Sequence, residues 1–245
     1  MNPSAPSDLL INLWPVPAVD AALRAPAGGR SLVVLQHGLW RSAFALGRIE
    51  RALRAHGYEV LNVSYPSTRA TIETHAESLG VAIRAYLATR PEPPPAISFV
   101  GHSLGGLVIR SYLSRPDAVR ATACVFIATP HRGAALAAKS QGRLWFRWLM
   151  GDKAARQLVP GDPFYATLRP LHGVAVGNIV GGAGDDAGLR ASRAGDGDGT
   201  VRVEEAHLEG ETDWVRLPLS HTRLGMADAT IAQVLRFLAA RRFGD

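Results

Sequence analysis

The residue best suited to chemistry is a serine that lies between two glycines at a predicted strand-to-helix turn. Residues 97–100 predict a strand, residues 104–114 predict a helix, and the segment between and around them reads Gly101-His102-Ser103-Leu104-Gly105-Gly106. In a Gly-x-Ser-x-Gly turn the serine has a strained backbone, and the small flanking residues let strand and helix approach closely. Such a turn exposes the hydroxyl for attack on a carbonyl carbon. We therefore predict that Ser103 is a nucleophile.

A serine nucleophile needs a general base, and one histidine has the right place in the chain. When the three catalytic residues follow one another along the chain as serine, acid and histidine, the histidine lies on a loop after the last strand. His221 follows the strand expected at residues 214–219 and precedes the closing helix expected at 227–241. The other histidines come too early or do not follow the last strand: His37, His56, His75, His102, His131, His172 and His207. We predict that His221 is the base.

The acid that would orient this imidazole should follow the strand expected at residues 174–180. The glycine-rich loop after that strand carries four aspartates: Asp185, Asp186, Asp196 and Asp198. We favour Asp198, with Asp196 as the alternative. Many carboxylates among glycines are also typical of a calcium loop, but the spacing lacks the downstream glutamate of an EF-hand. We therefore expect a catalytic acid in this loop and no metal site.

Attack on a carbonyl also needs two backbone donors for the developing oxyanion. One is normally the amide of the residue after the nucleophile, and the other comes from the loop after the first strand of the core. Leu104 and Leu39 fill these two places. Gly38, just before Leu39, would give the loop the freedom to present its amides. We predict that Leu39 and Leu104 form the oxyanion hole.

Alternating strands and helices must position these residues. Short apolar runs predict strands at residues 31–36, 58–65, 96–100, 121–128, 174–180 and 214–219. Apolar residues at helical spacing predict helices at residues 43–56, 71–90, 104–114 and 227–241. This alternation predicts an α/β fold, with a mostly parallel central sheet and helices on both faces. The length of 245 residues suits a single domain over residues 1–245.

The alternation breaks between residues 129 and 172, which we interpret as a short cap insertion. Within it, Leu144, Trp145, Trp148 and Leu149 share one helical stripe. This stripe packs against the body of the protein, lines a pocket for an acyl chain or contacts lipid. Five residues near the predicted site or in the cap are candidates to line that pocket: His37, Trp40, His102, Trp145 and Trp148.

Composition narrows the class of partner. The net charge is +6, but the positive residues are spread along the chain, so we expect no nucleic-acid partner. No apolar run approaches the roughly 18 residues of a membrane span, and the first ten residues lack the pattern of a secretory signal. The one cysteine, Cys124, lies in an apolar run, which predicts a buried thiol and excludes an internal disulfide. We expect a cytoplasmic protein without stable membrane insertion, and nothing in the sequence indicates its oligomeric state.

With these motifs in order, residues 31–242 resemble the serine esterase and lipase branch of the α/β-hydrolases, near bacterial lipases and glycosylphosphatidylinositol-inositol-deacylase-like proteins. The resemblance rests on six segments: Gln36-His37-Gly38-Leu39, Val63-Ser64-Tyr65-Pro66-Ser67, Gly101-His102-Ser103-Leu104-Gly105-Gly106, Ala128-Thr129-Pro130-His131-Arg132-Gly133, Asp198-Gly199-Thr200-Val201 and Ser220-His221. It implies that the aspartate of Asp-Gly-x-Val is the acid, which favours Asp198 over Asp196. It also implies that residues 129–133 shape the wall of the pocket.

The resemblance implies a reaction as well. Ser103 would attack the carbonyl of a small-molecule or lipid ester with His221 as general base, and water would then hydrolyse the acyl-enzyme. No cofactor is required. An acyltransferase with the same acyl-enzyme and a non-catalytic binding protein of this fold are the alternatives. The chain departs from the family in a sheet that lacks some N-terminal strands and in a short cap, and both departures leave the substrate open.

Overall fold

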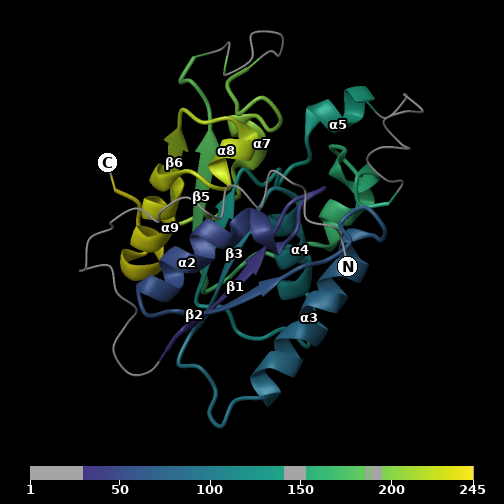
Figure 1. Cartoon of the computed structure of the whole chain (residues 1–245). Helices are drawn as coiled ribbons and strands as arrows, with labels where there is room; N and C mark the ends of the chain where they lie inside the picture. The colour runs from purple at the N-terminus through teal and green to yellow at the C-terminus, as the bar shows by residue number, and fades with distance from the viewer. Residues whose placement is uncertain (1–29, 141–152, 186–187, 189–194, 245) are drawn as a thin grey trace.

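A six-stranded parallel sheet forms the centre of the protein (Figure 1). The structure is a computed structural model that describes residues 30–140, 153–185, 188 and 195–244. The strands are β1 (Leu32–Gln36), β2 (Glu59–Val63), β3 (Ile97–His102), β4 (Ala123–Ile127), β5 (Ala175–Gly181) and β6 (Asp213–Leu217). Their order is β2-β1-β3-β4-β5-β6, and every neighbouring pair is parallel. The predicted parallel sheet is therefore confirmed.

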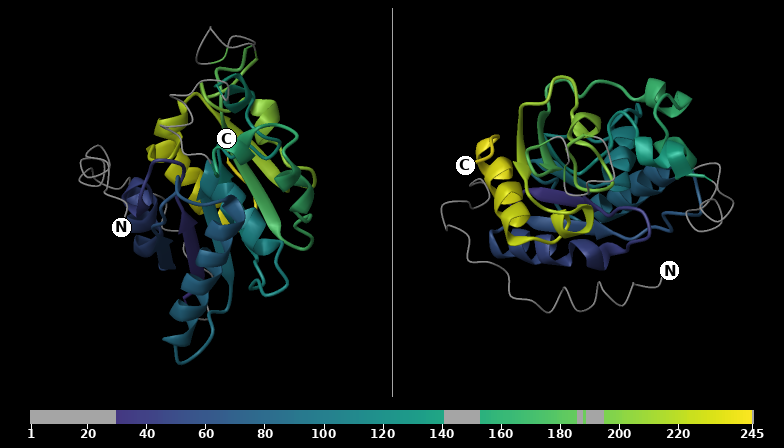
Figure 2. Two further views of the ribbon diagram at one scale, coloured as in Figure 1. Left: turned by 90° about the vertical axis from the view of Figure 1, so that its right-hand side faces the viewer. Right: turned by 90° about the horizontal axis from the view of Figure 1, so that it is seen from above.

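Four long helices cover the two faces of this sheet (Figures 1 and 2). One face carries α2 (Gly47–Ala55) and α9 (Asp228–Ala240), whose apolar residues pack with Val33, Leu35 and Val125. The other carries α3 (Ile72–Ala88) and α4 (Leu104–Leu113), which pack with Leu32, Val34 and Phe99. Alternate residues of one strand thus enter opposite cores, which explains why β4 is apolar throughout and β1 is apolar up to its last residue, Gln36. The predicted helices on both faces are confirmed.

The ends of the elements differ from the predictions by a few residues, and chain chemistry explains several of the differences. The helix predicted from residue 43 begins as a 3-10 turn, η1 (Ala43–Leu46), before α2. Strand β6 ends at Leu217 because Pro218 has no amide hydrogen for a ladder. Helix α3 begins after Thr71, whose hydroxyl accepts a hydrogen bond from the amide of Thr74.

The predicted cap region is only partly within the described residues. Its described elements are α5 (Ala135–Ser140), η2 (Arg156–Leu158) and η3 (Pro163–Thr167). The aromatic stripe with Trp145 and Trp148 lies outside the described residues, so its role stays a prediction. The arrangement as one domain with a cap insertion also stays a prediction. Two short helices complete the described chain, α7 (Val203–Ala206) and α8 (His221–Leu224), and no helix in the described ranges is long and apolar enough to cross a membrane.

The order of the strands brings the loop after β1 and the turn after β3 together at the carboxyl ends of the strands. From β1 the chain goes to the edge strand β2 and returns through α3 to β3, on the other side of β1. The last residue of β1, Gln36, lies opposite Gly101 of β3. The loop after β1 and the turn after β3 therefore leave the sheet side by side. Such a switch point is where open α/β sheets bind their ligands.

Candidate active site

The turn after β3 holds Ser103 in a conformation that few residues adopt. Its φ of 55° and ψ of −125° lie outside the ordinary regions for an L-residue. The Ser103 amide donates to the carbonyl of Ile127 at the end of β4, over 2.8 Å, which fixes the turn to the sheet. A Cβ at Gly105 would lie 2.1 Å from the carbonyl oxygen of Gln36, and one at Gly101 would lie 2.6 Å from Cα of Gly106. Both glycines are therefore required by close backbone contacts.

His221 lies between Ser103 and Asp198 and is hydrogen-bonded to both. Its Nδ1 is 2.6 Å from Oδ2 of Asp198, and its Nε2 is 3.0 Å from Oγ of Ser103. Because a carboxylate oxygen accepts, Nδ1 carries the hydrogen and Nε2 is left to accept from the serine hydroxyl. The three residues come from the turn after β3, the loop after β5 and the first position of α8. In sequence they are far apart, and the structure brings them into one hydrogen-bonded chain.

Asp198 is buried and held on both sides. Its Oδ1 accepts from the amides of Thr200 and Val201, each at 2.7 Å, while Oδ2 faces His221. Its main-chain carbonyl accepts from the amide of His221 at 3.0 Å. The side chain is thus fixed by its own loop, and that loop is tied to the start of α8. This arrangement orients the imidazole.

The other aspartates of this loop have different partners. The carboxylate of Asp196 accepts from the amides of Ala183 and Gly184, at 2.7 and 3.0 Å, and pairs with Arg216 at 3.4 Å. Asp185 accepts from the amide of Gly188. Asp186 lies outside the described residues. Among the described aspartates only Asp198 contacts His221, and Asp196 instead closes the loop onto the end of β5.

The amides of Leu39 and Leu104 lie beside the serine. Leu104 is the first residue of α4, where an amide has no partner within the helix. A Cβ at Gly38 would be 3.1 Å from Cβ of Ser103, so the loop with Leu39 runs directly against the serine. In the part of the chain that the structure describes, neither amide has a hydrogen-bond acceptor. Two free donors next to a serine hydroxyl can stabilise a negatively charged oxygen.

His37 is buried beneath the Leu39 loop and does not reach its surface. Its Nδ1 is 2.9 Å from the carbonyl oxygen of Gly38, and its Nε2 accepts from the Tyr65 amide at 3.2 Å. The ring also stacks on that of Tyr65, with centroids 4.4 Å apart. Burial lowers the pKa of His37 to about 4. A neutral imidazole fits this place, because protonated Nε2 would face the Tyr65 amide hydrogen.

His102 supports the other side of the site. It is buried, and its Nε2 donates to the main-chain carbonyl of His221 over 3.0 Å. Burial first, and then the charge of His221, lower the pKa of His102 to about 3. Of the predicted pocket residues that the structure describes, only Trp40 is exposed, at 49%. His37 and His102 are buried neighbours of Ser103 and His221, and their predicted role in lining a pocket stays a prediction.

Sequence reasoning missed two residues that hold the site loops. The hydroxyl of Ser67 accepts from the amide of Trp40 at 3.0 Å and so ties down the residue after Leu39. The buried carboxylate of Glu205 accepts from the amide of Arg202 at 2.9 Å and from the amide of Ala135 at 2.8 Å. It joins the loop of Asp198 to the start of α5. The spacing of Glu205 after residue 202 is that of a helix capping box, but position 202 carries arginine where that motif has serine or threonine, so the sequence gives no clear signal for Glu205.

Comparison with known proteins gives one family match. The model of the family described as "Putative serine esterase (DUF676)" matches residues 28–159. That range is more than half of the chain and includes Ser103, Leu39 and Leu104. Among curated proteins, no sequence matches the chain.

Solved structures resemble the protein over most of its length. The mature lipase BlEst2 of Bacillus licheniformis is 20% identical, with a TM-score of 0.68, over 92% of this chain and 96% of that one. A metagenomic carboxyl esterase is 22% identical, with a TM-score of 0.63, over 94% and 78%. The phospholipase PlaB of Legionella pneumophila is 17% identical, with a TM-score of 0.66, over 88% of this chain and 60% of that one. At such identities the likeness shows the fold, which is the predicted α/β-hydrolase fold.

Proposed function

The chain belongs to the serine esterase family DUF676 and is a serine hydrolase, and from this premise we propose that it cleaves carboxylic esters through an acyl-enzyme on Ser103. The observation that carries the proposal is the hydrogen-bonded chain from Ser103 Oγ through His221 to Asp198, beside the two free amides. The substrate class is a small-molecule or lipid ester. No cofactor takes part.

The first half of the reaction forms the acyl-enzyme. Ser103 Oγ attacks the ester carbonyl carbon while its proton passes to Nε2 of His221, which stands 3.0 Å away. Asp198 stabilises the resulting imidazolium through Nδ1. The carbonyl oxygen becomes an oxyanion and accepts from the amides of Leu39 and Leu104. The tetrahedral intermediate then collapses, and the alcohol leaves with the proton from Nε2.

The second half restores the enzyme. A water molecule loses a proton to Nε2 of His221 and attacks the acyl carbon, so that a second oxyanion forms at the same two amides. The bond from the carbon to Ser103 Oγ breaks, and Oγ regains its proton from Nε2. The acid product then departs. Each step uses the same hydrogen-bonded chain in alternating directions.

The test is ester hydrolysis by wild type and Ser103→Ala, measured as p-nitrophenol release from esters of increasing acyl length. We expect Ser103→Ala to lose about 10⁶-fold in kcat, since loss of a serine nucleophile removes the acyl-enzyme. Ser78→Ala, on the outer side of α3, is the matched control and should keep wild-type rates. A fluorophosphonate should label wild type and Ser78→Ala but not Ser103→Ala. Equal rates in wild type and Ser103→Ala would refute the proposal.

A further inference from the structure

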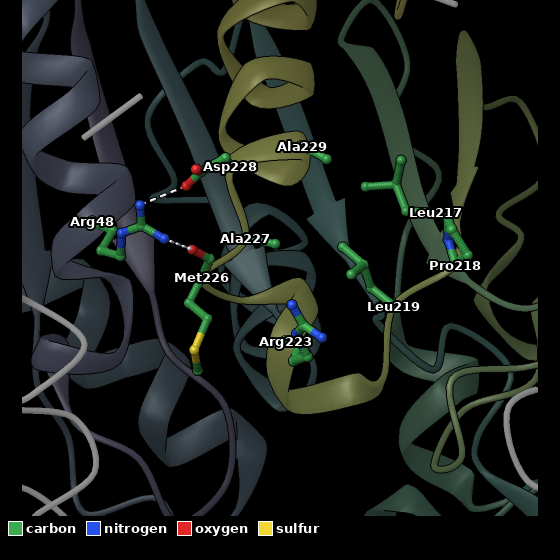
Figure 3. Close-up of a pocket in the computed structure, with 9 residues that line it drawn as sticks. All are labelled: Arg48, Leu217, Pro218, Leu219, Arg223, Met226, Ala227, Asp228 and Ala229. Carbon is green, nitrogen blue, oxygen red and sulfur yellow. Dashed lines mark hydrogen bonds and ion pairs between the residues drawn. The ribbon is translucent and has the colours of Figure 1, made fainter. Parts of the chain in front are cut away.

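A cavity lies beside α8, apart from Ser103. It has a volume of about 480 Å³ and is bounded by α2, by the start of α9 and by the chain that runs from β6 into α8 (Figure 3). None of Ser103, Asp198 and His221 lines it. The lining consists of Arg48, Leu217, Pro218, Leu219, Arg223, Met226, Ala227, Asp228 and Ala229. The volume is within the range of small-molecule sites.

The walls of this cavity are mostly apolar, with charge in two places. Arg48 is buried and compensated, because it pairs with Asp228 at 2.5 Å and donates to the carbonyl of Met226 at 2.6 Å. Figure 3 shows this cluster on one side of the cavity and the side chains of Leu217, Pro218 and Leu219 on the other. A ligand that fits must therefore bury apolar surface along one wall.

Arg223 differs from Arg48 because its charge is not balanced. It is exposed, and the described residues provide no carboxylate and no hydrogen-bond acceptor for its guanidinium. Its side chain points toward the middle of the lining residues (Figure 3). With two arginines and one aspartate, the cavity carries one uncompensated positive charge. A guanidinium in this state can bind a carboxylate through two parallel hydrogen bonds.

We propose that this cavity binds an amphiphilic monocarboxylate, a medium-chain fatty acid, with its carboxylate on Arg223 and its alkyl chain along Leu217, Pro218 and Leu219. One uncompensated cation matches one negative charge. A second negative charge on the ligand would meet Asp228, so a monoanion fits better than a dianion. The apolar wall selects against small hydrophilic acids. A medium-chain fatty acid meets all three conditions, because it has one carboxylate, no second charge and an alkyl chain to bury.

The site has a direct connection to the active site. Helix α8 begins at His221 and carries Arg223, and the strand end at Leu217 leads into it. A carboxylate on Arg223 therefore acts on the helix that holds the proposed base. In the proposed ester hydrolysis the ligand is chemically an acid product, so its binding would couple product concentration to turnover. This coupling rests on the proposed function, whereas binding itself does not.

The experiment is calorimetric titration of sodium decanoate, below its micelle concentration, into the full-length Ser103→Ala protein and into the same protein with cavity substitutions. We expect saturable binding that weakens at least tenfold in Arg223→Gln and is largely kept in Arg223→Lys. Arg169→Gln is the matched control, because it removes one exposed arginine on the loop before β5, and it should bind as the parent does. Ala229→Phe, which places a ring at the cavity, should weaken binding without a change of charge.

Three comparisons decide the proposal. Binding that is equal in Arg223→Gln and its parent would overturn it, and so would decanol binding as tightly as decanoate. Binding to Ala229→Phe at parental affinity would exclude this cavity. Because calorimetry needs no turnover, the result is separate from the hydrolysis test: failure of Ser103→Ala to lose activity would refute the proposed function and leave this site unaffected.

Discussion

The two sides of Ser103 are built on opposite principles. One side, which we call the base side, contains His221 and Asp198. There Ser103 Oγ, both ring nitrogens of His221 and both carboxylate oxygens of Asp198 each have a hydrogen-bond partner. On the oxyanion side, the amides of Leu39 and Leu104 have no acceptor within the described chain. A proton relay must be oriented before substrate arrives, whereas an oxyanion hole must be oriented and empty. The hydrogen-bond partners on the base side suit the proposed proton relay, and the free amides on the other side suit the proposed oxyanion hole.

On the oxyanion side, the amides of Leu39 and Leu104 make no hydrogen bonds within the described chain that could fix their own position. Neighbouring residues must therefore hold the Leu39 loop in place. Ser67 fixes the amide of Trp40, one residue after Leu39. His37 supports the loop from below, through the carbonyl of Gly38 and the amide of Tyr65. Gly105 lets α4 approach the end of β1. We therefore predict that loss of a residue on the base side abolishes proton transfer. Substitutions on the oxyanion side should only displace the backbone donors and should have smaller effects on kcat.

Among the residues that support Ser103, the largest expected effect is the loss of the acid on the base side. Asp198→Asn should lower kcat by about 10⁴-fold, because an amide donates to Nδ1 and holds the imidazole in the wrong tautomer. Asp196→Asn is the matched control, two residues away in the same loop, and should lower kcat less than tenfold. Steady-state kinetics with a p-nitrophenyl ester measures both. If the two variants lose kcat to a similar extent, Asp198 has no role in proton transfer beyond the loop-closing role of Asp196.

A smaller effect is expected where the oxyanion side depends on close packing. In Gly105→Ala the new methyl would meet the carbonyl of Gln36 at 2.1 Å, so the end of β1 and the Leu39 loop must move. We expect kcat to fall about 10²-fold, the size of the loss of one oxyanion donor, with a lower melting temperature. Gly225→Ala is the control, because its Cβ would have no contact closer than 3.6 Å. Wild-type kcat in Gly105→Ala would show that the hole does not rely on this contact.

Acid pH should affect both sides, through one buried histidine on each. The pKa of His37 is about 4 and that of His102 about 3, both below the ordinary 6.5. The unfolded chain therefore binds more protons than the folded protein below pH 6.5, so the free energy of unfolding falls as the pH drops and levels off only below the folded pKa values. At pH 5 each histidine accounts for about 2 kcal/mol of this fall.

Urea unfolding at pH 7 and pH 5 measures this fall. His37→Gln should reduce the difference between the two pH values by about 2 kcal/mol, and His102→Gln should do the same. His172→Gln, on the exposed loop before β5, is the control and should keep the wild-type difference. A pH dependence unchanged in both His37→Gln and His102→Gln would mean that burial of these rings does not determine acid stability.

The two sides also differ in how far the sequence predicts them. The proposed relay of Ser103, His221 and Asp198 is predicted from motif, chain order and resemblance, because a relay needs particular side chains at particular strand ends. Leu39 and Leu104 can be indicated only by position, since an amide has no residue type of its own. Ser67 and Glu205 escape prediction because they act through contacts between loops distant in sequence, which periodicity does not encode. The sequence could not indicate that the rings of His37 and His102 are buried, because adjacency to a motif does not tell which way a ring points.

The smallest expected effect tests whether one hydrogen bond on the oxyanion side matters at all. Ser67→Ala removes the acceptor of the Trp40 amide and leaves the Leu39 loop less fixed, at a cost to stability of about 1 kcal/mol. We expect kcat to fall about fivefold with KM nearly unchanged, because a displaced oxyanion donor weakens binding of the transition state more than of the substrate. Ser64→Ala is the matched control: the Ser64 hydroxyl accepts from the amide of Ala43, the first residue of η1, which follows this loop. If Ser64→Ala and Ser67→Ala lower kcat equally, the bond to Trp40 has no special role, and the Leu39 amide is held by His37 and the packing at Gly105 alone.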